Sequence, residues 1–125
     1  CALPISVRFI GHVKARYGFS KGSLLVVPSR GDSMPYVVIE AGAAGIPMIA
    51  ANVGGIPEIF DTHTDALFAP SNVAAMADAI KAALDNPTAT AARAQKLRER
   101  ISEHFSQSAM VEGVLAGYRD AFAKR

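Results

Sequence analysis

The stretch SLLVVPSRGDSMPYVVIEAGAAGIPMIAANVGG, residues 23–55, decides the fold. It opens with a continuous apolar run, Ser23–Ser29, which is typical of a strand buried on both faces. A helix rich in alanine and glycine follows, and its small side chains allow close packing against a sheet. Another short strand, "PMIAA", and a glycine turn complete the stretch. It therefore predicts a β-α-β unit with parallel strands.

The segments on either side extend this alternation of strands and helices. We expect a strand at Ile5–Gly11, where apolar and polar residues alternate, and then a short helix that closes at Gly22. A further strand is expected in "DALFAP", residues 65–70, and the rest of the chain reads as helical. The pattern predicts one α/β domain, residues 1–125, with a Rossmann-like doubly wound parallel sheet and C-terminal helices.

Three helices are expected to close the chain. Asn72 or Ser71 can cap the first of them, and Pro87 suits the first turn of the second. The spacing of apolar residues predicts an apolar face on the first and the last of these helices, and the face of the last helix is either core or an interface with another part of a longer protein. These faces are Val73, Met76, Ala77, Ile80 and Leu84 on the first, and Met110, Val114, Leu115, Tyr118 and Phe122 on the last.

Composition excludes several classes of protein. A net charge of +2 over 125 residues is too small to indicate a nucleic-acid partner or an acidic membrane surface. No apolar run approaches the roughly 18 residues of a membrane span. The single cysteine, Cys1, excludes an intrachain disulfide and favours a reducing compartment. Because the chain runs from a non-Met start straight into a strand, we expect it to be part of a longer protein.

The loop Pro28–Pro35 marks the first candidate site. In open α/β sheets, ligands bind outside the carboxyl ends of the strands. Ser33 can cap the following helix and Pro35 fits its first turn, which leaves the N–H groups of Tyr36 and Val37 unpaired. Together with the helix dipole these N–H groups predict an anion site, and phosphate is its commonest occupant.

Two carboxylates flank this helix start. Asp32 lies in the loop and Glu40 about one turn inside the helix, while Gly54 and Gly55 let a second backbone segment approach the same ligand. A carboxylate only accepts hydrogen bonds and suits a pair of hydroxyls. Hydroxyls on both sides of a phosphate describe a nucleotide sugar. Such an acidic pair is also common by chance, so Glu40 as a surface charge and Asp32 as a loop or capping residue remain alternatives.

These residues resemble a known motif. In order and spacing, the sequence is similar to the C-terminal, donor-binding lobe of GT-B fold retaining glycosyltransferases, the glycosyl transferases group 1 family. The matching segments are Pro28-Ser29, Asp32, Glu40-Ala41, Ala43–Pro47 and Val53–Glu58. The stretches "VRFIGHV" and "SLLVVPS" and the closing helices resemble the family as well, so the resemblance covers nearly the whole chain.

The resemblance implies roles for particular residues. Glu40 would bind the ribose hydroxyls, and Asp32 would face the transferred sugar as the catalytic contact. The remaining donor contacts would be Ser33, Met34, Tyr36 and Val37 at the diphosphate, and Gly11, His12 and Val13 at the base. His12 could equally be a turn residue. Lys14 and Arg16 could lean toward the nucleotide, or be solvated helix charges.

Two positions depart from the family pattern. Asp32 stands where the family has glutamate and is one methylene shorter. Pro35 replaces a glycine and donates no N–H to the phosphates.

The function implied is that of a donor lobe. It would bind a nucleotide diphosphate sugar, linked to UDP or GDP, and transfer the sugar with retention to an acceptor sugar or lipid-linked glycan held by an N-terminal lobe. We expect no metal and no further cofactor, and no activity from this lobe alone, because the cations that clamp the diphosphate lie upstream in the family. By analogy the parent enzyme would work in the cytoplasm, at the inner face of a bacterial membrane. The alternative is a non-catalytic α/β module that binds phosphate or a nucleotide.

Overall fold

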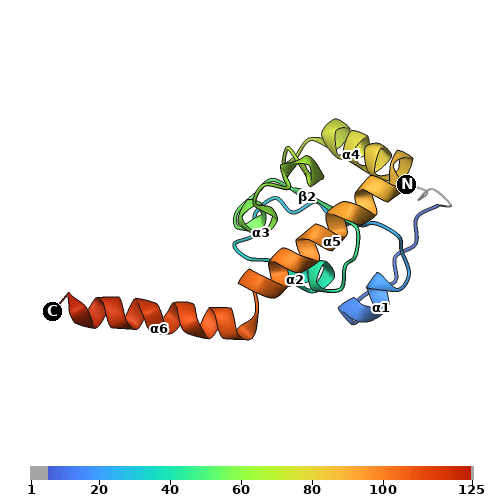
Figure 1. Ribbon diagram of the computed structural model, residues 1–125. Helices are drawn as coiled ribbons and strands as arrows, with labels where there is room; N and C mark the ends of the chain where they lie inside the picture. Colours follow the sequence, from blue (N-terminus) through green and yellow to red (C-terminus); the bar gives the residue numbers. More distant parts are fainter. Residues whose placement is uncertain (1–5, 125) are drawn as a thin grey trace.

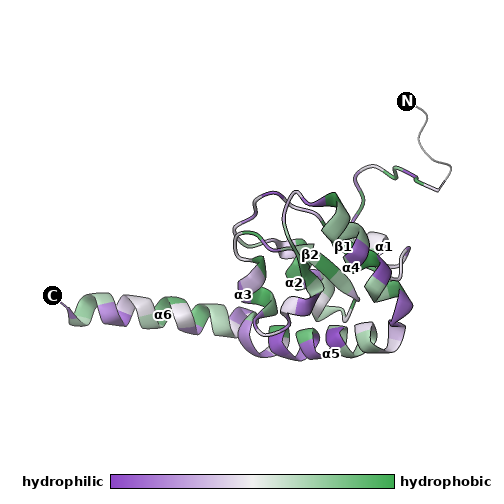
Figure 2. Ribbon diagram, turned by 90° about the horizontal axis from the view of Figure 1, so that it is seen from above, coloured by the Kyte–Doolittle hydropathy of each residue, from purple (hydrophilic) through white to green (hydrophobic). Residues whose placement is uncertain are grey.

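The centre of the domain is a parallel sheet of three strands in the order β1-β2-β3. The computed structural model describes residues 6–124. β1 (Leu25–Val27) pairs with β2 (Met48–Ala51), which in turn pairs with β3 (Leu67–Phe68). Figure 2 shows β1 and β2 as neighbouring arrows surrounded by helices. The predicted α/β class and its parallel sheet are confirmed.

Helices connect these strands and close the chain. A short 3-10 helix, η1 (Thr64–Ala66), leads into β3. The α-helices of the described residues are α1 (Ala15–Phe19), α2 (Tyr36–Ala43), α3 (Ile56–Phe60), α4 (Val73–Asp85), α5 (Pro87–His104) and α6 (Gln107–Ala123). Pro87 occupies the first turn of α5, as its fixed φ predicts.

The sheet is covered on both faces, so the fold is doubly wound. All four residues of β2 are buried. Met48 and Ala50 pack into the core formed with α2, α3 and α5, whereas Ile49 and Ala51 pack with α4 on the other face. Because successive side chains of a strand point to opposite faces, a strand covered on both sides is apolar throughout.

The small residues of α2 allow it to pack closely against a second helix, α5, as well as against the sheet. A Cβ atom at Gly42 would overlap the Ile101 side chain of α5 and would lie 3.4 Å from Leu97 Cγ. Figure 1 shows α5 crossing in front of α2. Glycine at this position therefore sets the distance between the two helices.

The strand predicted at Ile5–Gly11 is wrong. Ile5 lies outside the described residues, and Ser6–Gly11 form no strand, with Phe9 77% exposed. A strand needs a neighbour whose N–H and C=O groups complete its ladder. Within residues 6–124 no strand lies alongside this segment, so alternation in the sequence does not produce one here.

The cap predicted for α4 is confirmed, but its predicted buried face is partly wrong. The Ala75 N–H donates to Asn72 Oδ1 at 2.9 Å. Val73 and Leu84 are exposed instead of buried. A row of alanines faces the sheet, and their small side chains let the helix approach it. The residues of α4 that cover β2 and β3 are Ala75, Met76, Ala79, Ile80 and Ala83.

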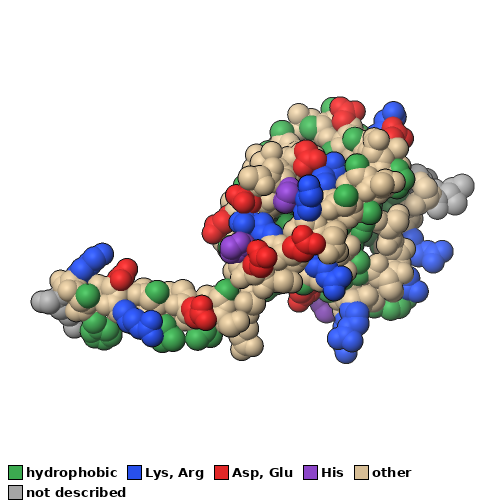
Figure 3. Space-filling view, in the orientation of Figure 1, with side chains coloured by type: hydrophobic (Ala, Val, Ile, Leu, Met, Phe, Trp, Pro, Cys, Tyr) green, Lys and Arg blue, Asp and Glu red, His purple; other side chains and the backbone are tan. Residues whose placement is uncertain are grey.

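The last helix, α6, leaves the domain as an arm (Figure 1). Its start is capped by Ser106, which accepts from the Ala109 N–H at 3.2 Å. Its apolar face, expected either in the core or at an interface with another part of the protein, is exposed throughout, from Met110 to Phe122. Figure 3 shows hydrophobic side chains along the lower edge of this arm. The amphipathic pattern is real, but within residues 6–124 the rest of the domain does not cover it.

Removal of residues 107–125 is expected to leave a folded domain. Because no residue of α6 is buried, we expect the melting temperature to shift by less than about 4 °C. Removal of residues 87–125 is the matched control, and it should abolish cooperative melting because Leu97 and Ile101 leave the core. Circular dichroism on heating measures both. Loss of the transition in the shorter deletion would contradict the structure.

Candidate functional site

Two loops meet where β1 and β2 end. The Gly55 N–H donates to the Asp32 carbonyl oxygen at 3.1 Å. A Cβ atom at Gly54 would overlap that same carbonyl, and one at Gly55 would overlap the Ser33 carbonyl. Gly54 also has a φ of 53°, a conformation that side chains disfavour. The Gly-Gly turn therefore supports the loop that carries Asp32, at the edge of the sheet where ligands are expected.

The start of α2 differs from the prediction by one residue. Pro35 is the N-cap residue, with φ −74° and ψ 113°, and the helix begins at Tyr36. No side chain caps the helix, so the cap predicted for Ser33 is wrong. Ser33 lies two positions before the N-cap and its carbonyl packs against Gly55, which leaves its hydroxyl outside capping range.

The first turn of α2 keeps free donors. The N–H groups of Tyr36 and Val37 find no acceptor within the described chain. Both residues are exposed, Tyr36 to 78%. Two unpaired N–H groups at a helix start attract an anion, because the helix dipole adds to their own partial charge.

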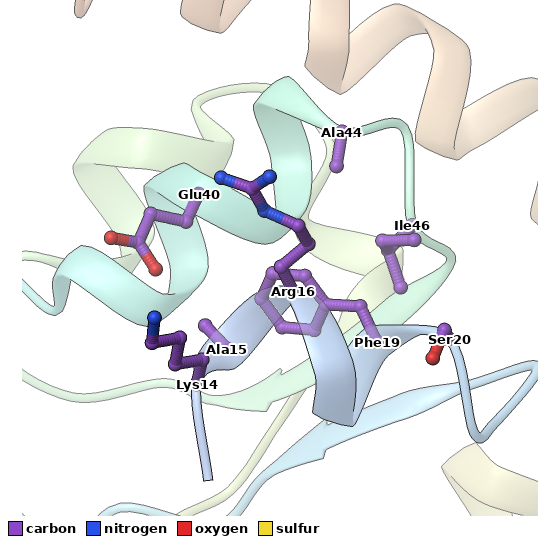
Figure 4. Close-up of a pocket in the computed structure, with 8 residues that line it drawn as sticks. All are labelled: Lys14, Ala15, Arg16, Phe19, Ser20, Glu40, Ala44 and Ile46. Atoms are coloured by element: carbon purple, nitrogen blue, oxygen red, sulfur yellow. The ribbon is translucent and has the colours of Figure 1, made fainter.

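A cleft of about 610 Å³ lies between α1 and α2 (Figure 4). Glu40 lines it from α2, one turn beyond Tyr36. Lys14 and Arg16 line it from the α1 side, and in Figure 4 both extend toward α2. None of these three charged side chains has an ion pair or hydrogen bond within residues 6–124. The other lining residues are Ala15, Phe19, Ser20, Ala44 and Ile46.

The structure brings together only part of the predicted site. Asp32, Ser33 and Met34 lie on the loop above the glycine turn, next to the first turn of α2. The three residues predicted at the base do not line the cleft: Gly11, His12 and Val13 precede α1.

For Lys14 and Arg16 the sequence leaves two interpretations, a lean toward the nucleotide or a solvated helix charge. Both residues line the cleft and both are exposed, and the signal in the sequence is their position directly after the segment expected at the base.

The helix that follows the glycine turn is anchored at its far end. Arg100 of α5 donates from Nη2 to the Glu58 carbonyl at 2.9 Å and from Nε to the Ile59 carbonyl at 3.0 Å. Its Nη1 also lies 3.3 Å from Asp61 Oδ2. Asp61 has a φ of 53°, a costly value for a residue other than glycine. Arg100 therefore satisfies two carbonyls in the last turn of α3 and forms an ion pair with the strained residue after it.

Two further properties concern metals and membranes. The described residues bring together no group of three or more His, Cys, Asp or Glu side chains that could hold a metal ion. None of the helices between residues 6 and 124 is long and apolar enough to cross a membrane.

The fold and this edge define a class: a parallel α/β domain of the GT-B type, with loops that gather at the carboxyl ends of its strands. The sequence profile of the family described as "Glycosyl transferases group 1" matches residues 2–86. The chain belongs to this family of glycosyltransferases.

Similar proteins include enzymes with different names. Glycogen synthase of Mycobacterium tuberculosis is 33% identical over 104 residues, which cover 80% of this chain and 25% of that protein. D-inositol 3-phosphate glycosyltransferase of Streptomyces coelicolor is 41% identical over 88 residues, 67% of this chain and 19% of that protein. The solved structure of sucrose-phosphate synthase from Thermosynechococcus elongatus matches with a TM-score of 0.78 and 30% identity, over 94% of this chain and 31% of that one. The chain thus spans roughly a fifth to a third of the length of these relatives.

Gly54→Ala is expected to destabilise the domain by about 2–4 kcal/mol, since the new Cβ overlaps the Asp32 carbonyl and disfavours the positive φ. The matched control is Gly113→Ala, where nothing lies within 4 Å of the new Cβ in an exposed helix. Because α6 contributes little to the stability of the domain, that change should alter the free energy of unfolding by less than about 0.5 kcal/mol. Urea denaturation of both variants measures the difference, and equal effects would contradict the close contact.

Arg100→Ala is expected to lower the free energy of unfolding by about 1–3 kcal/mol, because two carbonyls of α3 lose their donor. Arg100→Lys keeps the charge without the planar fork, so an intermediate loss is expected. Lys96→Ala, at an exposed position of the same helix, should change stability by less than about 0.5 kcal/mol. If denaturant curves of Arg100→Ala and Lys96→Ala coincide, the anchor is refuted.

Proposed function

We propose that this chain is the donor-binding lobe of a retaining glycosyltransferase and that its donor is a nucleotide diphosphate sugar. One observation carries the proposal within this family: Glu40 lies unpaired in a cleft, one helical turn from the free N–H groups of Tyr36 and Val37. A carboxylate and an anion site at this separation suit the ribose and the diphosphate of one nucleotide.

Each part of the donor has a proposed contact. Glu40 accepts hydrogen bonds from the ribose hydroxyls, and the N–H groups of Tyr36 and Val37 donate to the diphosphate. Ser33 and Met34 border the diphosphate from the loop. Asp32, whose backbone is held by the Gly-Gly turn, faces the transferred sugar and accepts from its hydroxyls.

The proposal extends to the parent enzyme. An N-terminal lobe would hold the acceptor, a sugar or a lipid-linked glycan, and would complete the active site for transfer with retention. The relatives' names point to different acceptors and products, so the acceptor is not carried over from any one of them. The donor would be linked to UDP or GDP and need no metal. We further propose that the enzyme works in the cytoplasm, at the inner face of a bacterial membrane.

A non-catalytic module that binds a phosphate or a nucleotide is the second candidate. It needs the same helix start, but neither Asp32 nor a second lobe. Family membership favours the transferase. A parent gene that encodes no lobe upstream of this domain would favour the module.

Glu40→Ala is expected to weaken UDP or GDP binding about tenfold or more, because it removes at least one charge-assisted hydrogen bond to ribose, worth about 1.5 kcal/mol. The wild-type chain should also prefer UDP to 2′-deoxy-UDP, and the variant should not. Amide-shift titrations by NMR measure both, with wild-type affinities on the order of 0.1 to several mM.

Glu112→Ala, an exposed position on α6, is the matched control and should leave both affinities unchanged. If Glu40→Ala binds UDP as the wild type does, or keeps the preference for ribose, Glu40 does not bind the ribose.

A further inference from the structure

The cleft continues along α2 beyond Glu40. Tyr36, Glu40 and Ala44 follow one another at intervals of four residues, so they lie along one side of the helix, about 6 Å apart per step. This inference rests on the proposed function, which puts the diphosphate at Tyr36 and the ribose at Glu40. A nucleotide bound in that direction directs its base toward Ala44.

The wall at this end of the cleft comes from α1. Phe19 is partly buried and packs against the main core, so its ring holds a fixed position. Ile46 and Ala44 complete an apolar surface on the α2 side. In Figure 4 the guanidinium of Arg16 lies between Glu40 and Ala44. A flat apolar pocket with one cation at its rim fits a nucleobase, which stacks on its faces and forms hydrogen bonds at its edge.

The polar side chains here mostly donate. Arg16 carries five N–H donors and no acceptor, and Lys14 three donors and no acceptor. The hydroxyl of Ser20 uses its one hydrogen on the Tyr17 carbonyl at 2.8 Å, so among these residues it is the one that can only accept from a ligand, at a separate position from Arg16. The acceptors of Glu40 are committed to the ribose. Binding is therefore favoured when the base presents a carbonyl oxygen to Arg16. It is disfavoured when the base presents an amino group, because the amino hydrogens then face a cation.

We propose that Arg16 is a specificity-determining residue that selects donors with a keto base, uracil or guanine. Its guanidinium donates to O4 of uracil or to O6 of guanine. The amino group of cytosine or adenine occupies the corresponding position and offers no acceptor there.

Two nucleotide pairs isolate this contact. UDP differs from CDP at position 4 of the base, and IDP differs from ADP at position 6, a carbonyl against an amino group in each case. In NMR or calorimetric titrations of the wild-type chain, we expect UDP to bind about three- to tenfold more tightly than CDP. We expect IDP to bind more tightly than ADP by a similar factor. Arg16→Gln should bring both ratios close to one, because an amide can donate or accept.

Lys21→Gln is the matched control. Its ammonium lies 4.7 Å from the centre of the Tyr17 ring, it does not line the cleft, and its removal changes the net charge by the same amount. Both ratios should persist in this variant. Equal affinities within each wild-type pair, or ratios that survive in Arg16→Gln, would overturn the inference.

Glu40→Ala separates this inference from the proposed function. If Glu40→Ala loses nucleotide binding while Arg16→Gln keeps the wild-type ratios, the donor site stands and only the role of Arg16 fails. If Glu40→Ala leaves every affinity unchanged, or if none of the four nucleotides binds the wild-type chain at several millimolar, the donor site fails and the inference fails with it.

Discussion

The rest of the site depends on one contact, the packing of the Gly54-Gly55 turn against the backbone of Asp32 and Ser33. It joins the loops that leave two neighbouring strands, so the position of each loop depends on the other. Helix α2 begins directly after the loop that carries Asp32. The position of this loop therefore determines the direction in which the first N–H groups of α2 point. At the other end of α3, Arg100 prevents the helix from shifting away from the turn. Contacts that run from Arg100 of α5 through α3 to the Gly-Gly turn thus hold the backbone at the edge of the sheet.

Much of the fold could be predicted because the signals were local. The apolar run of β1, the short strand β2, the cap at Asn72 and the first-turn proline at Pro87 each follow from a few adjacent residues. The predictions that were wrong depend on contacts with distant parts of the chain, which local sequence patterns do not reveal. Ile5–Gly11 alternates like a strand, but a strand forms only beside a partner, and nothing local supplies one. Likewise, α4 faces the sheet with its alanines, because the distance to the sheet, and not the apolar pattern alone, decides which side is buried.

The candidate site was predictable in part, for the same reason. Asp32, Glu40 and the helix start belong to one continuous motif, so their spacing along the chain fixes their arrangement. The failed cap at Ser33 shows the limit, since a contact with Gly55, more than twenty positions later, decides where its backbone lies. Arg16 lies in the cleft because α1, a helix of five residues, rests on α2. No pattern within so short a helix reveals which side of it will face a neighbour.

The charges of the domain suggest how recognition and catalysis are divided. A helix start contributes roughly half a positive charge, whereas a leaving nucleoside diphosphate carries two or more negative charges. Of the two full cations in the cleft, Arg16 extends between Glu40 and Ala44, where the base would lie, and only Lys14 lies toward the start of α2 in Figure 4. On the proposed function, the described residues therefore recognise the nucleoside, while neutralising the departing diphosphate requires further cations. The relatives are three to five times longer than the part this chain matches, which leaves room for a lobe that supplies them. On that proposal, separating the two tasks would let the nucleoside bind before the lobes close, so that the strongest electrostatic stabilisation would act only with the acceptor in place.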